Sequence, residues 1–128
     1  MSRQTCPTAV PGAARRVLVV EDEPAIRALF AQVLRRDGNE VFEAEDGYAA
    51  VTLAATFTEP IDLVVTDVVM PRLHGPDAVE AIRGRMPTLK ALYVSGYTAG
   101  AELGGEPLLE KPFGVDELLA AVRDLLEG

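Results

Sequence analysis

The sequence predicts an α/β fold in which a parallel β-sheet is covered by helices on both faces. From Arg16 onward, short runs of aliphatic and β-branched residues alternate with longer segments whose apolar residues recur at helical spacing. Alternating strands and helices form parallel sheets, because each helix carries the chain back to the edge where the next strand starts. The 128 residues are the usual size of one domain.

The first half of the chain is expected to form two strands and two helices. RVLVVE at 16–21 is typical of a buried strand. Pro24 suits the first turn of the helix that follows, and Gly38 is expected to end it. NEVFEA at 39–44 predicts the second strand, and 47–57 a weaker helix. The expected inward faces of the two helices are Ile26, Leu29, Phe30, Val33 and Leu34, and then Val51, Ala54 and Ala55.

The second half is expected to add three strands and two helices. IDLVVTD at 61–67 predicts the third strand, KALYVS at 90–95 the fourth and PLLEK at 107–111 the fifth. A helix over 77–86 is expected to end before Pro87, and the clearest amphipathic helix ends the chain. The inward residues of these helices are expected to be Val79, Ile82 and Met86, and then Val115, Leu118, Leu119, Val122, Leu125 and Leu126.

Composition limits the domain organisation and the location. Residues 1–14 are rich in Pro, Ala and Thr and indicate a flexible tail or linker, which leaves 15–128 as the folded domain. No apolar run approaches the roughly 18 residues of a membrane span, and no apolar signal core opens the chain. With the single cysteine, Cys6, this favours a cytoplasmic protein without membrane insertion. The net charge of −8 argues against nucleic-acid binding, and one histidine argues against a zinc site.

Polar residues collect at the ends of the expected strands. Glu21 and Asp22 follow the first strand, Asp67 ends the third, Ser95 the fourth, and Lys111 the fifth. The carboxyl ends of parallel strands meet at one edge of the sheet, where open α/β sheets place their sites. Each residue alone also has a structural explanation, such as helix capping by Asp22. The order of all of them on successive strands is much less expected by chance.

The chemistry of these residue types favours phosphoryl transfer with a metal ion. Two carboxylates about 4 Å apart repel by roughly 4 kcal/mol at an effective dielectric constant near 20. A magnesium ion relieves that repulsion, since oxygen ligands are those it prefers. Lys111 adds a compact positive charge for Asp67 or a phosphoryl oxygen, and Ser95 can donate a hydrogen bond. An aspartate held in this way can act as a nucleophile and form an aspartyl phosphate.

Four stretches, VLVVEDEP, DLVVTDVVMPRLHG, ALYVSGYT and LLEKPF, resemble the receiver domain of bacterial two-component response regulators over about residues 16–127. SGYT followed by LEKPF looks most like receivers of hybrid histidine kinases. The resemblance implies a flavodoxin-like sheet of order 2-1-3-4-5, a signalling module rather than an enzyme, and phosphorylation by a histidine kinase or a histidine phosphotransfer protein. No helix-turn-helix follows the last helix, so a stand-alone regulator or a hybrid-kinase receiver is expected.

The resemblance also implies roles for individual residues. Asp67 matches the phosphoacceptor, and Mg²⁺ would be held by Asp22, by Asp67, by the main-chain carbonyl of Val69 and, mainly through water, by Glu21. Ser95 and Lys111 match the residues that contact the phosphoryl group. The bond before Pro112 is cis in the family. Val69 and Tyr97 match positions that tune dephosphorylation, and neither is an acid or amide that could orient water.

The sequence departs from the family at two places. Leu108 occupies the switch position, which is usually Tyr or Phe. Residues 96–106 are too few for two loops and a helix of mean length, about 11–12 residues, so the family's fourth helix is expected to be shortened or missing. The face that the family forms from its fourth helix, fifth strand and fifth helix must therefore be altered, and a homodimer through it is a further expectation.

Two other functions are compatible with parts of the pattern. A receiver-like scaffold that works without phosphorylation would fit the missing fourth helix, although all the site residues are present. An aspartate-based phosphohydrolase also has a nucleophilic Asp after a strand, but it resembles an Asp-x-Asp pattern, and Val69 occupies the second acidic position here.

Overall fold

Five parallel strands form one sheet, as the sequence predicted, in the order β2-β1-β3-β4-β5 that the resemblance implied. This computed structural model describes residues 14–70, 72–96 and 105–127. The strands are β1 (Arg16–Val20), β2 (Glu40–Ala44), β3 (Leu63–Asp67), β4 (Lys90–Ser95) and β5 (Leu108–Glu110). Parallel pairing aligns Val20 with both Ala44 and Thr66, and Asp67 with Val94. The ends of these strands therefore lie along one edge of the sheet.

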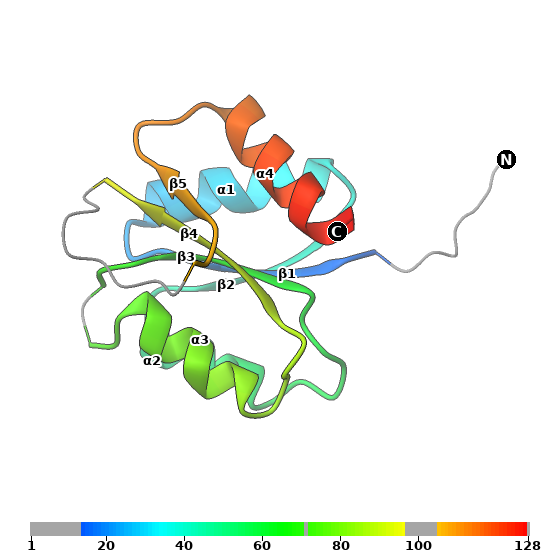
Figure 1. The fold of residues 1–128 in the computed structure, drawn as a ribbon, viewed down its shortest axis with the longest axis vertical. Helices are drawn as coiled ribbons and strands as arrows, with labels where there is room; N and C mark the ends of the chain where they lie inside the picture. The colour runs from blue at the N-terminus through cyan, green and yellow to red at the C-terminus, as the bar shows by residue number, and fades with distance from the viewer. Residues whose placement is uncertain (1–13, 71, 97–104, 128) are drawn as a thin grey trace, which may run out of the picture.

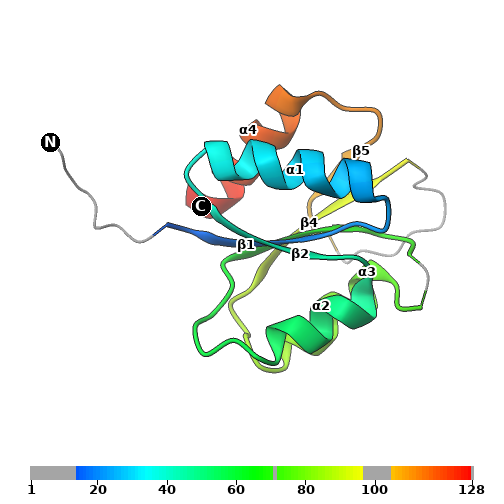
Figure 2. The same ribbon diagram turned by 180° about the vertical axis from the view of Figure 1, so that it is seen from behind.

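Four helices in the described residues cover the two faces of the sheet. They are α1 (Pro24–Arg36), α2 (Gly47–Ala54), α3 (Gly75–Arg83) and α4 (Val115–Glu127). Figure 1 shows α1 and α4 on one face and α2 and α3 on the other, and Figure 2 shows the same two layers from behind. The expectation of a shortened or missing helix between β4 and β5 concerns residues 97–104, which lie outside the described residues, as does the proposed tail up to residue 13.

Alternation along the strands divides the core into two halves. Val17 and Val19 of β1 face α1 and α4, whereas Leu18 and Val20 face α2 and α3. Because helices cover both faces, every residue of β3 is buried, which explains its nearly continuous apolar sequence. Asp67, at the end of this run, is the exception that the site explains.

Local signals fix where the helices begin and end. Pro24 opens α1, and Gly38 follows it with a positive φ of 93°, a conformation that glycine adopts without steric cost. The Asp46 side chain caps α2 by accepting a hydrogen bond from the Ala49 amide at 2.7 Å. The helix expected over 77–86 instead spans Gly75–Arg83, and Met86, although buried, lies after its end.

Three expected core positions were wrong. Leu29 and Val115 are 47% and 43% exposed. In α2, Ala50 and Ala54 are buried, whereas Ala55 is an exposed cap residue and Val51 is only half-buried. Alanines occur on several sides of this short helix, so their spacing does not identify the buried face.

At the edge of the sheet opposite the acidic residues, the last turn of α4 accepts hydrogen bonds from side chains at the starts of β1 and β4. Arg15 Nη1 donates to the Leu126 carbonyl at 2.7 Å, and Lys90 Nζ donates to the Leu125 carbonyl at 2.6 Å. Within the part of the chain that is described, no helix has both the length and the apolar character needed to cross a membrane.

Candidate functional site

The sheet brings together the charged residues that the sequence placed at strand ends. Glu21 follows β1, Asp67 is the last residue of β3, Ser95 is the last residue of β4, and Lys111 follows β5. Carboxylate oxygens of Glu21, Asp22 and Asp67 all lie within 4.8 Å of one another. Glu21 is 2% exposed and Asp67 is 9% exposed, while Asp22 faces solvent. Two of the three acids are thus withdrawn from water at the bottom of the cluster.

Lys111 supplies the positive charge between the buried acids. Its Nζ lies 3.4 Å from Glu21 Oε1 and 3.4 and 3.3 Å from the two carboxylate oxygens of Asp67. Burial disfavours its ammonium, but the charges of Asp67 and Glu21 outweigh burial, and the pKa of Lys111 is raised. The backbone helps to place it, since the Lys111 amide donates to the Ser95 carbonyl at 2.8 Å. The ammonium is therefore held as a cation against Asp67.

Glu21 carries the strongest electrostatic strain of the site. Burial, followed by the neighbouring Asp67, raises its pKa to about 7. Its Oε2 accepts from the Glu23 amide at 3.1 Å, and Arg27 donates to its main-chain carbonyl at 2.8 Å. One lysine does not compensate three clustered carboxylates, and this donor set of hard oxygens fits a divalent cation.

The main chain at Asp67 is held by close contacts. The Thr66 hydroxyl donates to the Asp67 carbonyl at 3.0 Å, and the Gly75 amide donates to the Val68 carbonyl at 2.9 Å. A Cβ on Gly75 would overlap the Asp67 carbonyl oxygen. Only glycine allows the start of α3 to approach β3 this closely, so Gly75 fixes the backbone from which the Asp67 side chain extends.

The other predicted residues occupy the same edge or adjoin it. Val69 is 62% exposed, two residues beyond Asp67, and Ser95 is 4% exposed. Leu108 is half-buried and is aligned with Tyr93 of β4. The Lys111–Pro112 peptide bond is cis. Tyr97 lies outside the described residues.

A second cluster of interacting side chains, which sequence reasoning missed, lies next to the site. Arg72 lies in the loop after β3, Asp46 precedes α2, and Tyr48 lies in the first turn of α2. Arg72 Nη1 is 3.3 Å from Asp46 Oδ2, and its guanidinium lies 4.6 Å from the Tyr48 ring centre. The pair Asp46–Gly47 was recognisable as a helix start. Its partner Arg72 was not, because the conformation of that loop is not encoded in a periodic pattern.

Comparison with known proteins identifies the family. The model of the response regulator receiver domain matches residues 17–123. The chain belongs to the receiver domain family and is a signalling module of two-component systems. It is 36% identical over 117 residues to the sensor kinase CckA of Brucella abortus, and 38% identical over 117 residues to the response regulator MprA of Mycobacterium tuberculosis.

The matches cover most of this chain but only part of its curated relatives. Both alignments span 87% of the chain, against 12% of CckA and 50% of MprA. The solved receiver domain of the hybrid histidine kinase CckA has a TM-score of 0.77 and 38% identity, covering 87% of this chain and 98% of that domain. The chemotaxis protein CheY4 of Vibrio cholerae has a TM-score of 0.78 and 28% identity, covering 88% and 99%.

The raised pKa of Glu21 predicts how the metal-free protein responds to pH. The folded state holds this proton up to about pH 7, whereas an ordinary glutamate loses it near 4.5. The stability that protonated Glu21 contributes is therefore fully present below about pH 4.5, and it is lost as pH rises through about 7. At pH 8 in EDTA, we expect the free energy of unfolding of Glu21→Gln to exceed that of the wild type by about 1–3 kcal/mol, so the variant should unfold at a higher temperature. At pH 4 the two proteins should differ little.

Thermal unfolding at the two pH values measures this difference. Glu80→Gln, which changes an exposed carboxylate on α3, is the control and should follow the wild type at both values. An unchanged difference between Glu21→Gln and the wild type at pH 4 and pH 8 would contradict the prediction.

Proposed function

We propose that this domain accepts a phosphoryl group on Asp67 from a phosphohistidine, with Mg²⁺, and that the modification changes its interactions with partners. The observation that carries the proposal is the position of Lys111, whose ammonium lies within 3.4 Å of both buried carboxylates. A lysine held there as a cation can balance charge that arrives on Asp67. Phosphorylation of the purified protein by acetyl phosphate, read by intact mass, tests the proposal.

The transfer itself needs one nucleophile and an ordered site. An Asp67 carboxylate oxygen attacks phosphorus, and the new O–P bond forms as the N–P bond of the phosphohistidine breaks. The imidazole nitrogen leaves with the electron pair of that bond and takes up a proton. Lys111 is placed to contact a phosphoryl oxygen, and Ser95, 4% exposed at the end of β4, to donate a hydrogen bond to another. The Lys111 ammonium already lies beside Asp67 before the reaction, so little reorganisation of this cation is needed.

The donor set supports a magnesium site formed by Asp22, Asp67 and the Val69 carbonyl, with Glu21 acting mainly through water. Carboxylate and carbonyl oxygens with room for water are the ligands Mg²⁺ prefers. Bound there, the ion would neutralise carboxylate and phosphoryl charge. Asp22 is the most solvent-accessible of the three acids, which suits a residue that must meet an incoming hydrated ion.

The response to phosphorylation is proposed to involve β4 and β5. Leu108 is aligned with Tyr93, which is 3% exposed, so the aromatic residue at this level belongs to β4. Repacking of Leu108 as Ser95 moves would change the surface of β5 and α4, where we also place a homodimer contact. Sedimentation before and after phosphorylation tests this contact; an unchanged monomer would exclude it. A scaffold that works without phosphorylation would show wild-type partner binding in an Asp67→Asn variant.

The phosphoryl group is expected to be long-lived. Val69 is 62% exposed beside the acceptor and offers no side-chain hydrogen bond to orient an attacking water. We expect Val69→Asn and Val69→Glu to lose the phosphoryl group several-fold faster than the wild type after removal of the donor. Decay followed by intact mass measures this, and Val69→Ile is the matched control. Equal decay in all four proteins would show that Val69 does not limit hydrolysis.

Two exposed apolar residues next to the site favour docking of the phosphohistidine donor. Leu29 lies in the second turn of α1 and Val115 begins α4, at the site end of both helices. Phe30, next to Leu29, stacks on Phe113, two residues before Val115, with 5.7 Å between ring centres. This contact joins α1 to the segment that leads into α4. An apolar patch beside the acceptor is where a donor domain must approach.

We expect Leu29→Glu to slow phosphoryl transfer from an autophosphorylated histidine kinase that phosphorylates the wild type, by about tenfold. Phosphorylation by acetyl phosphate should not change, because that small donor needs no protein surface. Thr52→Glu adds the same charge on α2, across the sheet, and is the control. If both donors slowed equally, Leu29 would act on the site rather than on docking.

A further inference from the structure

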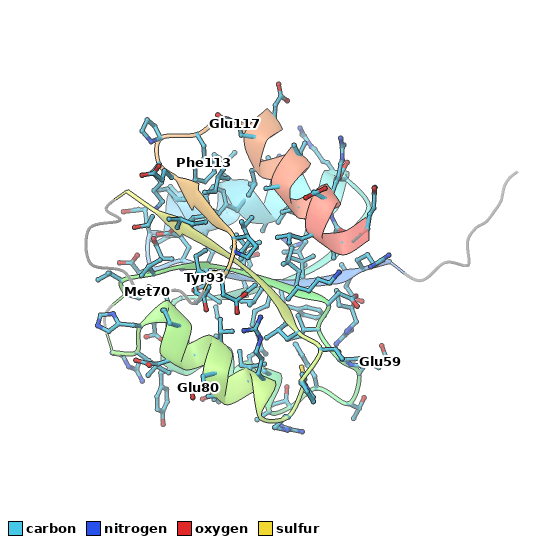
Figure 3. All side chains as sticks on the ribbon, in the orientation of Figure 1. Glu59, Met70, Glu80, Tyr93, Phe113 and Glu117 are labelled. Carbon is cyan, nitrogen blue, oxygen red and sulfur yellow. The ribbon has the colours of Figure 1, made fainter. Side chains whose placement is uncertain are left out.

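The loop between β3 and α3, described at residues 68–70 and 72–74, is packed at its start by two buried side chains. Val68 and Met70 are 6% and 3% exposed. Met70, labelled in Figure 3 at the end of α3 nearest the site, contacts the Thr66 hydroxyl with 4.0 Å between Oγ1 and Sδ. Val69, between these two residues, faces solvent. Apolar packing of Val68 and Met70 therefore holds the first half of this loop.

The second half of the loop is held by a different kind of contact. Arg72 has a φ of 73°, a left-handed conformation that residues other than glycine adopt at a steric cost. Its guanidinium reaches back to the start of α2, where it pairs with Asp46 and lies over the Tyr48 ring. The next residue, Leu73, approaches Gly47 so closely that a Cβ at Gly47 would overlap the Leu73 carbonyl oxygen. The left-handed conformation of Arg72, its contacts with Asp46 and Tyr48, and the approach of Leu73 to Gly47 all place this half of the loop against α2.

Asp46 is the fixed point of these contacts. Asp46 is 3% exposed, and its Oδ1 accepts the hydrogen bond from the Ala49 amide that caps α2. The other oxygen faces Arg72. A buried carboxylate needs such a partner, because an unpaired charge withdrawn from water is costly. The same side chain thus starts α2 and binds the loop that leads away from Asp67.

We propose that Arg72 is a positioning residue for the phosphoacceptor site: by pairing with Asp46 and covering Tyr48, it holds the loop that presents the Val69 carbonyl beside Asp67. The expected effect of Arg72 on Mg²⁺ binding rests on the proposed function, whereas its role in holding the loop does not. The loop joins the acceptor to α3 and ends at Gly75, whose amide donates to the Val68 carbonyl at 2.9 Å. Loosening one end of so short a loop displaces the carbonyl at the other.

Two variants are chosen to remove the pairing between Arg72 and Asp46 with the smallest change to the loop and to the cap of α2. Arg72→Asn removes the guanidinium but tolerates the left-handed conformation, in which Asn is enriched. Asp46→Asn keeps an acceptor for the Ala49 amide and removes the charge that Arg72 meets. Arg72→Lys, which keeps a cation, is the conservative variant. Arg123→Asn is the matched control, since it removes an exposed pair with Asp37 at the far end of α1.

Hydrogen–deuterium exchange of the metal-free proteins tests the holding of the loop. We expect exchange over residues 68–75 to become several-fold faster in Arg72→Asn and in Asp46→Asn, to return most of the way in Arg72→Lys, and to stay unchanged in Arg123→Asn. Exchange at wild-type rates in both Asn variants would overturn the proposal. So would an equal acceleration throughout the protein, because that reports loss of global stability.

The magnesium dependence of phosphorylation by acetyl phosphate tests the positioning role. We expect the half-saturating Mg²⁺ concentration to rise about tenfold in Arg72→Asn, with little change in the rate at saturating Mg²⁺. An unchanged half-saturating concentration alongside faster exchange would overturn the effect on the metal site. If the wild type itself gained no phosphoryl group, the proposed function would fail, and the exchange experiment alone would decide whether Arg72 holds the loop.

Discussion

Replacement of Asp67 by Asn is expected to abolish phosphorylation. The wild type, incubated with acetyl phosphate and Mg²⁺, should gain the mass of one phosphoryl group, whereas Asp67→Asn should gain none. An amide has nearly the shape of the carboxylate but is a far poorer nucleophile, so the loss should be complete rather than partial. Asn also removes the negative charge of Asp67, which contributes to raising the pKa of both Glu21 and Lys111.

A control separates loss of the nucleophile from loss of a negative charge. Asp124→Asn changes an exposed acid on α4 and should be phosphorylated like the wild type. Thermal unfolding should show that Asp67→Asn is folded and, without metal, at least as stable as the wild type, because one repelling charge has gone. A mass gain in Asp67→Asn equal to that of the wild type would assign the acceptor to another residue.

Replacement of Gly75 by Ala is expected to be the most damaging single-methyl change near the site. The added Cβ would overlap the Asp67 carbonyl oxygen, a backbone atom that cannot rotate away. Overpacking of this kind costs about 1–3 kcal/mol, which lowers the melting temperature by several degrees. The shift must also move β3 or the start of α3, so slower phosphorylation of Asp67 should accompany the loss of stability.

A second glycine provides the matched comparison. Gly84, the cap residue of α3, has a right-handed conformation, and a Cβ there would lie 3.2 Å from the Ala81 carbonyl oxygen. Gly84→Ala should therefore cost much less stability and leave phosphorylation unchanged. Equal melting temperatures for the two variants would show that the contact between Gly75 and Asp67 yields easily.

Most of the fold was predictable because its elements have strong periodic signals. The buried strand that ends in Asp67 and the amphipathic helix α4 were recognised from spacing alone, and the parallel order then placed Glu21, Asp67 and Lys111 at one edge. The direction in which Leu29 and Val115 face was not predictable, because apolar spacing does not distinguish a core residue from one on an exposed apolar patch.

The finer geometry of the site depends on contacts between segments that are distant in sequence. Gly75 is needed because the start of α3 lies against the Asp67 carbonyl at the end of β3. The residues around Gly75 do not indicate how closely these two elements approach. The left-handed conformation of Arg72 and its pairing with Asp46 likewise depend on how the loop returns to α2. Sequence periodicity describes which face of an element is buried, and it carries no information about such close approaches between loops.

The hydrogen bond from Arg15 to the Leu126 carbonyl has a mechanical consequence for any longer polypeptide that contains this domain. It places the two points where the chain enters and leaves the fold side by side, at the edge of the sheet remote from Asp67. Segments joined at these two points would therefore begin close together, at the edge of the sheet remote from Asp67. Neither attachment point lies at the edge that carries the acidic cluster.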